Sequence, residues 1–241
     1  MPRWFKRKKA DQMTYCAAVV VAAGSSTRMD GADKIMLPLR EEPVILHTLR
    51  ALERCACIQE IIVVTREELI VPIGSLCAEH LLIKVRKIVQ GGETRAHSVY
   101  QGIAEVSEQA QLIAIHDGAR PLVSEQIVQD AVSAAAKCGA AAPAVPVKDT
   151  IKRAVRGMVQ ETPDRTQLFA VQTPQVFEAD LIRAALFQAI RDKLPITDDC
   201  SAVERLGASV TLTEGGEENI KITTPGDVVH AEAILAGREM Q

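Results

Sequence analysis

The feature that most constrains this chain is the alternation of short Val- and Ile-rich runs with longer segments of helical period. This alternation is typical of βαβ units, which build a mostly parallel sheet. The runs are continuously apolar, as expected for strands covered by helices on both faces. We therefore predict an α/β fold with strands at residues 16–23, 60–65, 83–89, 112–116 and 140–147. The helices expected between them are 44–55, 67–79, 95–106 and 124–137.

The pattern changes after Pro146. Residues 149–160 are polar and basic, and they include Gly157, which can turn a hairpin. A segment this polar does not suit a central strand, so we predict an arm at residues 146–168 that lies exposed or packs on another subunit. The earlier pattern, typical of a parallel sheet, then resumes, with strands expected at 168–173, 209–213 and 219–223 and helices at 178–192, 198–206 and from Thr224 onward.

Composition limits the possible functions. With 241 residues and 47% hydrophobic residues, we expect one globular domain at 15–241. It follows a basic tail, residues 1–14, expected to be solvated and disordered, with a surface or partner anchor through Trp4 and Phe5 as the alternative. A net charge of -3 and 3% aromatic residues argue against nucleic acid binding.

The chain also lacks the signs of a membrane or secreted protein. Its longest apolar runs have about eight residues, far fewer than the roughly 20 that span a bilayer. The basic N-terminus is not followed by the apolar segment of a secretion signal. The six cysteines form no CxxC pair, so we interpret them as reduced core residues of a cytoplasmic protein.

The first expected strand leads into AAGSSTRM, residues 22–29. This turn would lie at the carboxyl edge of the sheet, where open α/β folds bind ligands. It fits neither GxGxxG nor GxxxxGK[ST]. Small residues, exposed backbone N–H groups and the cations Arg28 and Lys34 suit a triphosphate. The alternative is a plain strand-to-helix turn with an exposed arginine.

This loop, together with Asp33 and Lys34, resembles that of the cytidylyltransferases acting on 2-C-methyl-D-erythritol 4-phosphate. Further motifs follow in the order of that family: GGETRAHSV (91–99), HDGARP (116–121), DT (149–150), DR (164–165), QTPQ (172–175), TDDCSAVE (197–204) and NIKITTPGD (219–227). Each motif is weak alone, but their joint order over about residues 16–236 is specific. The resemblance implies a Rossmann-like nucleotidyltransferase fold with a mostly parallel twisted sheet, helices on both faces and a projecting β-arm for dimerisation.

The implied reaction joins a sugar-alcohol phosphate to the α-phosphorus of CTP and releases pyrophosphate. The attacking phosphate is already an anion, so catalysis needs positioning and cations rather than a general base. The resemblance assigns catalysis to Arg28, Lys34 and Lys221. Without the other motifs, Lys221 would be interpreted as a solvated residue on an alternating strand.

The resemblance also implies two binding regions. The nucleotide would contact Ala22, Ala23, Gly24, Gly92, Glu93, Ser98 and Gly118, with residues 92, 93 and 98 selecting cytosine. The alcohol phosphate would contact Asp117, Arg120, Thr150, Arg165, Thr173 and Thr197, with 150 and 165 supplied by the neighbouring subunit of a homodimer. The cofactor is expected to be Mg²⁺ at Asp117, unless that carboxylate is a loop cap. We expect His116 to be buried support.

Three departures from the family pattern stand near the triphosphate loop. Ser26 replaces a common glycine, the segment before Lys34 is one residue short, and Ile35 stands where Gln is usual. We expect the stand-alone form of the family, without a second catalytic domain after residue 241. Two alternatives remain open: a cytidylyltransferase for another polyol phosphate such as ribitol 5-phosphate, or a nucleotide-binding scaffold without turnover.

Overall fold

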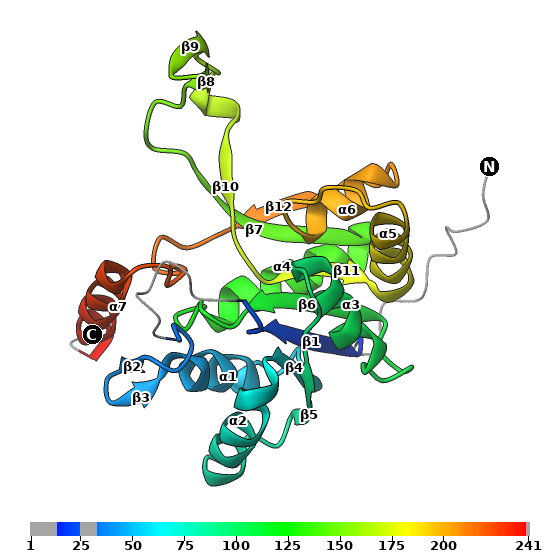
Figure 1. Cartoon of the computed structure of the whole chain (residues 1–241), viewed down its shortest axis with the longest axis vertical. Coiled ribbons are helices and arrows are strands. Elements are labelled where there is room, and N and C mark those ends of the chain that lie inside the picture. The colour runs from blue at the N-terminus through cyan, green and yellow to red at the C-terminus, as the bar shows by residue number, and fades with distance from the viewer. Residues whose placement is uncertain (1–13, 25–32, 240–241) are drawn as a thin grey trace.

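The computed structural model describes residues 14–24 and 33–239 (Figure 1). The basic tail up to residue 13 and the loop with Ser26 and Arg28 lie outside the described residues. The strands are β1 Cys16–Val21, β2 Pro38–Leu39, β3 Glu42–Pro43, β4 Glu60–Thr65, β5 Val85–Gln90, β6 Leu112–Asp117, β7 Ala140–Pro146, β8 Arg153–Val155, β9 Met158–Glu161, β10 Phe169–Val171, β11 Gln175–Glu178 and β12 Thr211–Glu214. The α-helices are α1 Val44–Arg54, α2 Glu67–Glu79, α3 Arg95–Ala104, α4 Glu125–Cys138, α5 Ala179–Arg191, α6 Asp199–Arg205 and α7 Pro225–Glu239.

An eight-stranded mixed sheet forms the centre of the molecule. Its order is β10-β7-β11-β6-β1-β4-β5, and β12 pairs with β7. The neighbours β6, β1, β4 and β5 are parallel, as predicted, so their carboxyl ends share one edge. The strands β10 and β11 are antiparallel to β7, which the sequence did not indicate.

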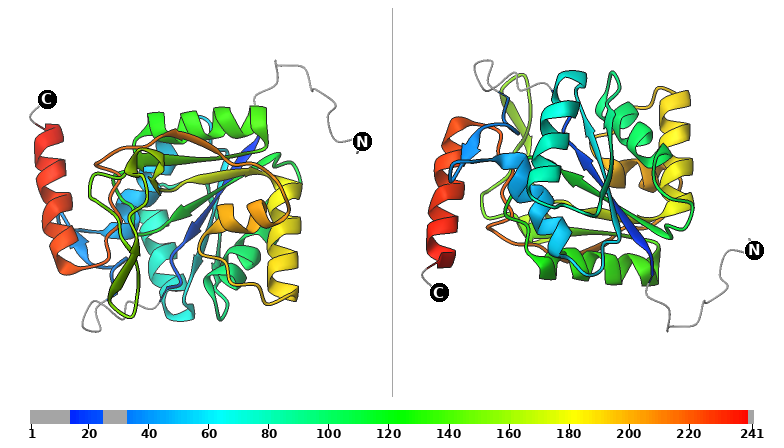
Figure 2. Two further views of the ribbon diagram at one scale, coloured as in Figure 1. Left: turned by 90° about the horizontal axis from the view of Figure 1, so that it is seen from above. Right: turned by 90° about the horizontal axis from the view of Figure 1, so that it is seen from below.

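Helices lie on both sides of this sheet (Figure 2). Side chains of β1 alternate between two apolar clusters: Ala18 and Val20 face the one with α1, α2 and α4, and Ala17 and Val19 face the one with α3, α5 and α6. All four are fully buried. Burial on both faces explains why the strand is continuously apolar.

Local sequence sets the ends of several helices. Thr94, Ser124 and Asp198 each accept a hydrogen bond from the backbone N–H three residues on, at the starts of α3, α4 and α6. Such bonds satisfy donors that a helix leaves unpaired. Helix α4 ends at Gly139, whose φ of 85° suits glycine.

A two-stranded hairpin projects from the sheet (Figure 1). It pairs β8 with β9 through Arg156 and Gly157, whose φ values are both positive, 49° and 79°. Two positive φ values match the tight turn that joins twisted antiparallel strands. The hairpin expected from Gly157 is therefore confirmed.

Two predictions were wrong. Residues 219–223 are irregular chain rather than a strand: the N–H of Ile222 bonds to the oxygen of Ala119, in a loop. Asn219 and Ile222 are buried, three residues apart, and the residues between them are half-buried, which is not the every-second-residue pattern of a strand. Cys138 is exposed and is not a core residue, although all six cysteines are free as expected.

Helix α3 packs closely on the sheet at Gly102. A Cβ atom there would lie 2.5 Å from Val64 Cγ2 and 2.6 Å from Val19 Cγ1. Gly102→Ala should therefore lower the free energy of unfolding by about 1–3 kcal/mol through overpacking. The matched control is Gly74→Ala in α2, where the nearest atom is 3.8 Å away. It should be neutral or stabilise by up to about 1 kcal/mol through helix propensity. Urea unfolding measures both, and equal effects would contradict the packing described.

Candidate active site

The predicted site residues gather where the parallel strands end. Asp117 is the last residue of β6, and Ala22 follows β1, the neighbouring strand. Gly91 follows β5 and is bonded to the end of β4 through its N–H and the oxygen of Thr65. This is the edge where open α/β sheets bind ligands.

Asp117 is the centre of a charged cluster. Its Oδ2 lies 2.8 Å from Lys221 Nζ and 3.6 Å from Arg120 Nε, and its Oδ1 lies 3.9 Å from Arg95 Nη2. The side chain of Asp117 is 11% exposed, whereas that of Lys221 is 38% exposed. A nearly buried carboxylate therefore holds one cation, Lys221, that a ligand can reach.

The charges of this cluster fix its protonation. Burial opposes the charged form of Asp117, yet Lys221, Arg95 and Arg120 lower the pKa of its carboxyl to about 2. Arg95 has a second carboxylate partner in Asp199, so Asp117 alone faces the two cations Lys221 and Arg120, which leaves one local positive charge. That excess favours a bound anion.

Arg95 makes a second, closer ion pair. Its Nη1 and Nη2 donate to the two carboxylate oxygens of Asp199 at 2.9 and 2.6 Å. Burial acts against the guanidinium, but Asp199 and Asp117 raise the pKa of Arg95. Asp199 itself is fully buried and its N–H donates to Gln175 Oε1 at 3.0 Å. Arg95 is thereby fixed in one orientation by a two-point contact.

A buried chain of hydrogen bonds supports Asp117 from behind. The N–H of Asp117 donates to Thr173 Oγ1 at 3.1 Å, and that oxygen lies 3.0 Å from His116 Nδ1. His116 Nε2 lies 3.2 Å from the oxygen of Arg120. Because a carbonyl only accepts, Nε2 carries the proton and Nδ1 accepts from Thr173. His116 is thus buried support, as expected.

The small residues predicted to bind nucleotide pack against one another. A Cβ on Gly91 would lie 2.4 Å from Ala23 Cβ, and one on Gly118 would lie 3.0 Å from Ala22 Cβ. Ser98 Oγ accepts from the N–H of Gly92 at 3.1 Å. The three loops therefore form one surface of backbone and small side chains. Glu93 is exposed beside it.

Lys34 is anchored through its neighbours. Arg66, which follows β4, donates a hydrogen bond to Asp33 Oδ2. The other carboxylate oxygen, Asp33 Oδ1, accepts from the N–H of Ile35 at 3.2 Å. Ile35 is buried in the core, which accounts for an apolar residue at this position. These contacts attach the segment of Lys34 to the end of β4.

Comparisons with known proteins agree with this geometry. A family model described as 2-C-methyl-D-erythritol 4-phosphate cytidylyltransferase matches residues 16–237. The chain belongs to this family.

Individual relatives match along nearly their whole length. The protein of that name from Caldanaerobacter subterraneus subsp. tengcongensis is 47% identical over 226 residues, covering 91% of this chain and 98% of the relative. The one from Bacillus velezensis is 44% identical over 219 residues, covering 90% and 94%. The crystal structure of 4-diphosphocytidyl-2C-methyl-D-erythritol synthase from Anaerococcus prevotii superposes with a TM-score of 0.84 at 30% identity, covering 93% of this chain and 97% of that one. The fold and the enzyme class expected from the motifs are confirmed.

The described chain brings some of the family's motif residues together and leaves others apart. Asp117, Arg120, Thr173 and Lys221 form one cluster. Thr197 stands just before α6, the helix that carries the partner of Arg95.

The two arm residues stand apart from this cluster. Thr150 and Arg165 are exposed near the hairpin, and Arg165 Nη1 donates to the oxygen of Lys148 at 2.8 Å. The roles assigned to all these residues stay predictions.

Sequence reasoning did not single out Arg95. Within the described motif GGETR, Arg95 is the residue whose side chain lies against both Asp117 and Asp199. The one local signal was a cation in the first turn of a helix, where the helix dipole disfavours it. That signal does not identify the partner, which stands 104 residues away in the sequence.

The described side chains of the site offer few ligands for Mg²⁺. The described residues contain no group of three His, Cys, Asp or Glu side chains that could hold a metal ion. Asp117 offers one carboxylate, which already faces three cations. Mg²⁺ at this site would therefore have to receive most of its ligands from phosphate oxygens and water, as this ion commonly does.

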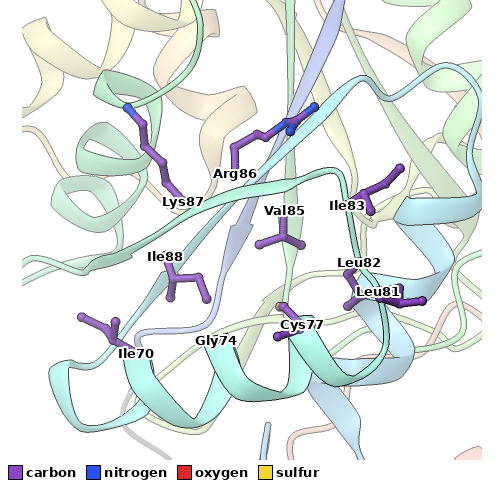
Figure 3. A pocket seen from close by; sticks show the side chains of 11 residues that line it. Ile70, Gly74, Cys77, Leu81, Leu82, Ile83, Val85, Arg86, Lys87 and Ile88 are labelled. Atoms are coloured by element: carbon purple, nitrogen blue, oxygen red, sulfur yellow. The ribbon is translucent and has the colours of Figure 1, made fainter.

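An apolar groove lies away from this cluster. It has a volume of about 550 Å³ and runs between α2 and β5 at the edge of the sheet (Figure 3). Its lining is apolar except for Arg86 and Lys87, and it includes none of the predicted site residues.

In the part of the chain that the structure describes, no helix is long and apolar enough to cross a membrane.

Buried His116 gives the protein a defined acid sensitivity. Burial lowers its pKa from 6.5 to about 4, so the unfolded chain takes up this proton at higher pH than the folded chain. The associated stability is fully present above pH 6.5 and is lost as pH falls to 4. Between pH 7 and 4 the loss should be about 3 kcal/mol.

Urea unfolding at these two pH values checks this prediction. His116→Gln should be less stable at pH 7 but should lack that pH-dependent loss. His230→Gln, at an exposed position of α7, should keep it. A wild-type slope in His116→Gln would contradict the prediction.

Proposed function

We propose that this chain transfers the cytidylyl group of CTP to 2-C-methyl-D-erythritol 4-phosphate at the cluster around Asp117. The products are CDP-methylerythritol and pyrophosphate, in the non-mevalonate isoprenoid pathway. The observation that carries the proposal is the meeting of Arg95, Arg120 and Lys221 around one carboxylate, at the edge where the family's nucleotide loops also end.

The chemistry is a displacement at phosphorus. A phosphate oxygen of the acceptor forms a bond to the α-phosphorus of CTP, and the bond to the bridging oxygen breaks. Pyrophosphate leaves with that electron pair. No proton has to be removed from the acceptor, because its phosphate is already ionised at neutral pH.

The main barrier is repulsion between two anions. Each close pair of like charges costs on the order of 4 kcal/mol near a protein surface. Lys221 and Arg120 would meet the acceptor phosphate, and Lys34 and Arg28 would meet the triphosphate. Asp117 keeps Lys221 and Arg120 in place rather than reacting itself, since both lie within 3.6 Å of its Oδ2.

The nucleotide would lie on the surface formed by Ala22–Gly24, the turn at 91–92 and Gly118. Small side chains let the ligand approach backbone groups, and Glu93 and Ser98 would select cytosine. Mg²⁺ carried by the phosphates would be held by Asp117 and would neutralise charge on the triphosphate.

A homodimer would complete the site. The arm and its return strand expose large apolar side chains: Ile151, Val155, Met158, Val159, Phe169 and Val171. A cluster of this kind is unusual on a surface that faces only water. A second copy covering it would bring Thr150 and Arg165 to the neighbouring cluster.

We also propose a cytoplasmic location. The six free cysteines support it, because such thiols persist in a reducing compartment. Low aromatic content and a net charge of -3 support small-molecule substrates and argue against nucleic acid as a partner.

The decisive experiment offers the purified chain CTP, Mg²⁺ and one acceptor at a time, and measures pyrophosphate. Methylerythritol phosphate should support turnover at least about tenfold faster than ribitol 5-phosphate, because the acceptor pocket belongs to this family. Equal or reversed rates would favour the ribitol alternative. No release with either acceptor would favour a scaffold.

In the same assay, Lys34→Ala and Lys221→Ala should each lower turnover by at least about tenfold without unfolding the chain. The matched control is Lys137→Ala, on an exposed position near the end of α4, which should keep the wild-type rate. Full rates in both lysine variants would remove the proposed catalytic roles.

The shared site predicts complementation between two inactive chains. Arg165→Ala and Lys34→Ala, unfolded together and refolded as a mixture, should recover about a quarter of the wild-type activity, because half of the dimers are hybrids with one intact site. Each variant refolded alone is the control. A mixture no more active than its parts would show that the arm does not serve the neighbouring subunit.

A further inference from the structure

Asn219 is a fully buried polar residue at the start of the segment that carries Lys221. Its Nδ2 donates to the oxygen of Thr173 at 3.0 Å and to Gln172 Oε1 at 3.1 Å. Both partners only accept in these bonds, which fixes the orientation of the amide. Its Oδ1 is buried and has no hydrogen-bond partner among the described residues.

An unsatisfied buried oxygen is costly. What offsets that cost in Asn219 is the pair of hydrogen bonds that its Nδ2 donates to Thr173 and Gln172. Buried polar groups of this kind call for a specific explanation. The contacts of the neighbouring backbone supply one.

Gln172 holds Asn219 from the end of β10. Gln172 Nε2 donates to the oxygen of Gly216 at 2.8 Å, and its Oε1 accepts from the N–H of Gly216 at 3.2 Å as well as from Asn219. The side-chain amide of Gln172 thus bonds to both the N–H and the oxygen of Gly216, as the backbone of a neighbouring strand would. The segment has little regular structure of its own, so these bonds fix its path.

The other side of the segment contacts the cluster. The backbone oxygen of Asn219 accepts from Arg120 Nη1 at 2.6 Å. Three residues on, the N–H of Ile222 donates to the oxygen of Ala119 at 2.8 Å. Lys221 lies between these two points, with its Nζ 2.8 Å from Asp117.

We infer that Asn219, held by Gln172, is a positioning residue that fixes Lys221 and Arg120 for the acceptor phosphate. The inference rests on the proposed function for its kinetic consequence. The hydrogen bonds of Asn219 join it to Arg120, Gln172, Thr173 and Gly216, and none joins it to the described nucleotide loops at 22–24 and 91–98. Its loss should therefore weaken use of the acceptor and leave CTP binding unchanged.

Asn219→Asp tests this, because it keeps the shape but places a carboxylate oxygen against Thr173 O and Gln172 Oε1. We expect kcat/KM for the acceptor to fall at least about tenfold while KM for CTP stays within about twofold. Asn219→Ser removes the amide without adding charge, and it should also lower kcat/KM for the acceptor while leaving KM for CTP unchanged. This variant replaces Asn219→Asp in the test if the aspartate variant does not fold.

The matched control is Gln59→Leu. Gln59 Oε1 accepts from the N–H of Cys16 at 2.7 Å, at the opposite end of β1 from the site. This variant should be less stable but should keep both kinetic constants. A merely structural role for Asn219 predicts the same result for its own variants.

Amide hydrogen exchange gives a readout that does not depend on turnover. The N–H of Ile222 should exchange at least about tenfold faster in either Asn219 variant than in wild type or Gln59→Leu, because the segment is no longer held. Unchanged exchange, or equal losses for CTP and acceptor, would overturn the inference. A wild-type chain that releases no pyrophosphate would overturn the proposed function alone.

Discussion

The compensation of one carboxylate by three cations is the interaction on which the site depends. Asp117 stands at the end of a buried strand, and its partners come from α3, from the loop after β6 and from the segment before α7. Removal of that charge would take away the carboxylate partner of Arg120 and Lys221, while Arg95 would keep Asp199. The same excess of positive charge that would make the empty cluster unstable is what a phosphate can use.

The residues that hold this cluster in place from behind have one feature in common. Thr173, Gln172 and Asn219 are buried polar side chains that bond mostly to backbone groups of neighbouring loops. A loop bonded in this way gains a defined position without belonging to a strand. The sheet therefore supplies rigid ends, and buried amides and hydroxyls extend that rigidity to residues 117–120 and 216–222.

Sequence reasoning succeeded where one physical signal dominated. Strand Glu60–Thr65 and helix Glu67–Glu79 were predicted to the residue, since burial on two faces and an acidic first turn mark them strongly. The strand Gln175–Glu178 was missed because four residues carry too little periodicity. The position of Lys221 was predicted only through motif order, and Arg95 escaped notice because its acidic partner stands 104 residues away. Contacts over such distances depend on topology rather than on local pattern.

The open edge of the sheet at β5 has a consequence for the behaviour of the protein in concentrated solution. This strand offers unpaired backbone groups beside an apolar groove and the exposed side chains of Leu81 and Ile83 (Figure 3). Arg86 is exposed on this strand, and Lys87 beside it pairs through Nζ with Glu105 Oε2 at 2.7 Å. Charged side chains on an edge strand oppose its pairing with an identical edge. The chain can thus keep an unpaired edge without growing into stacked fibres.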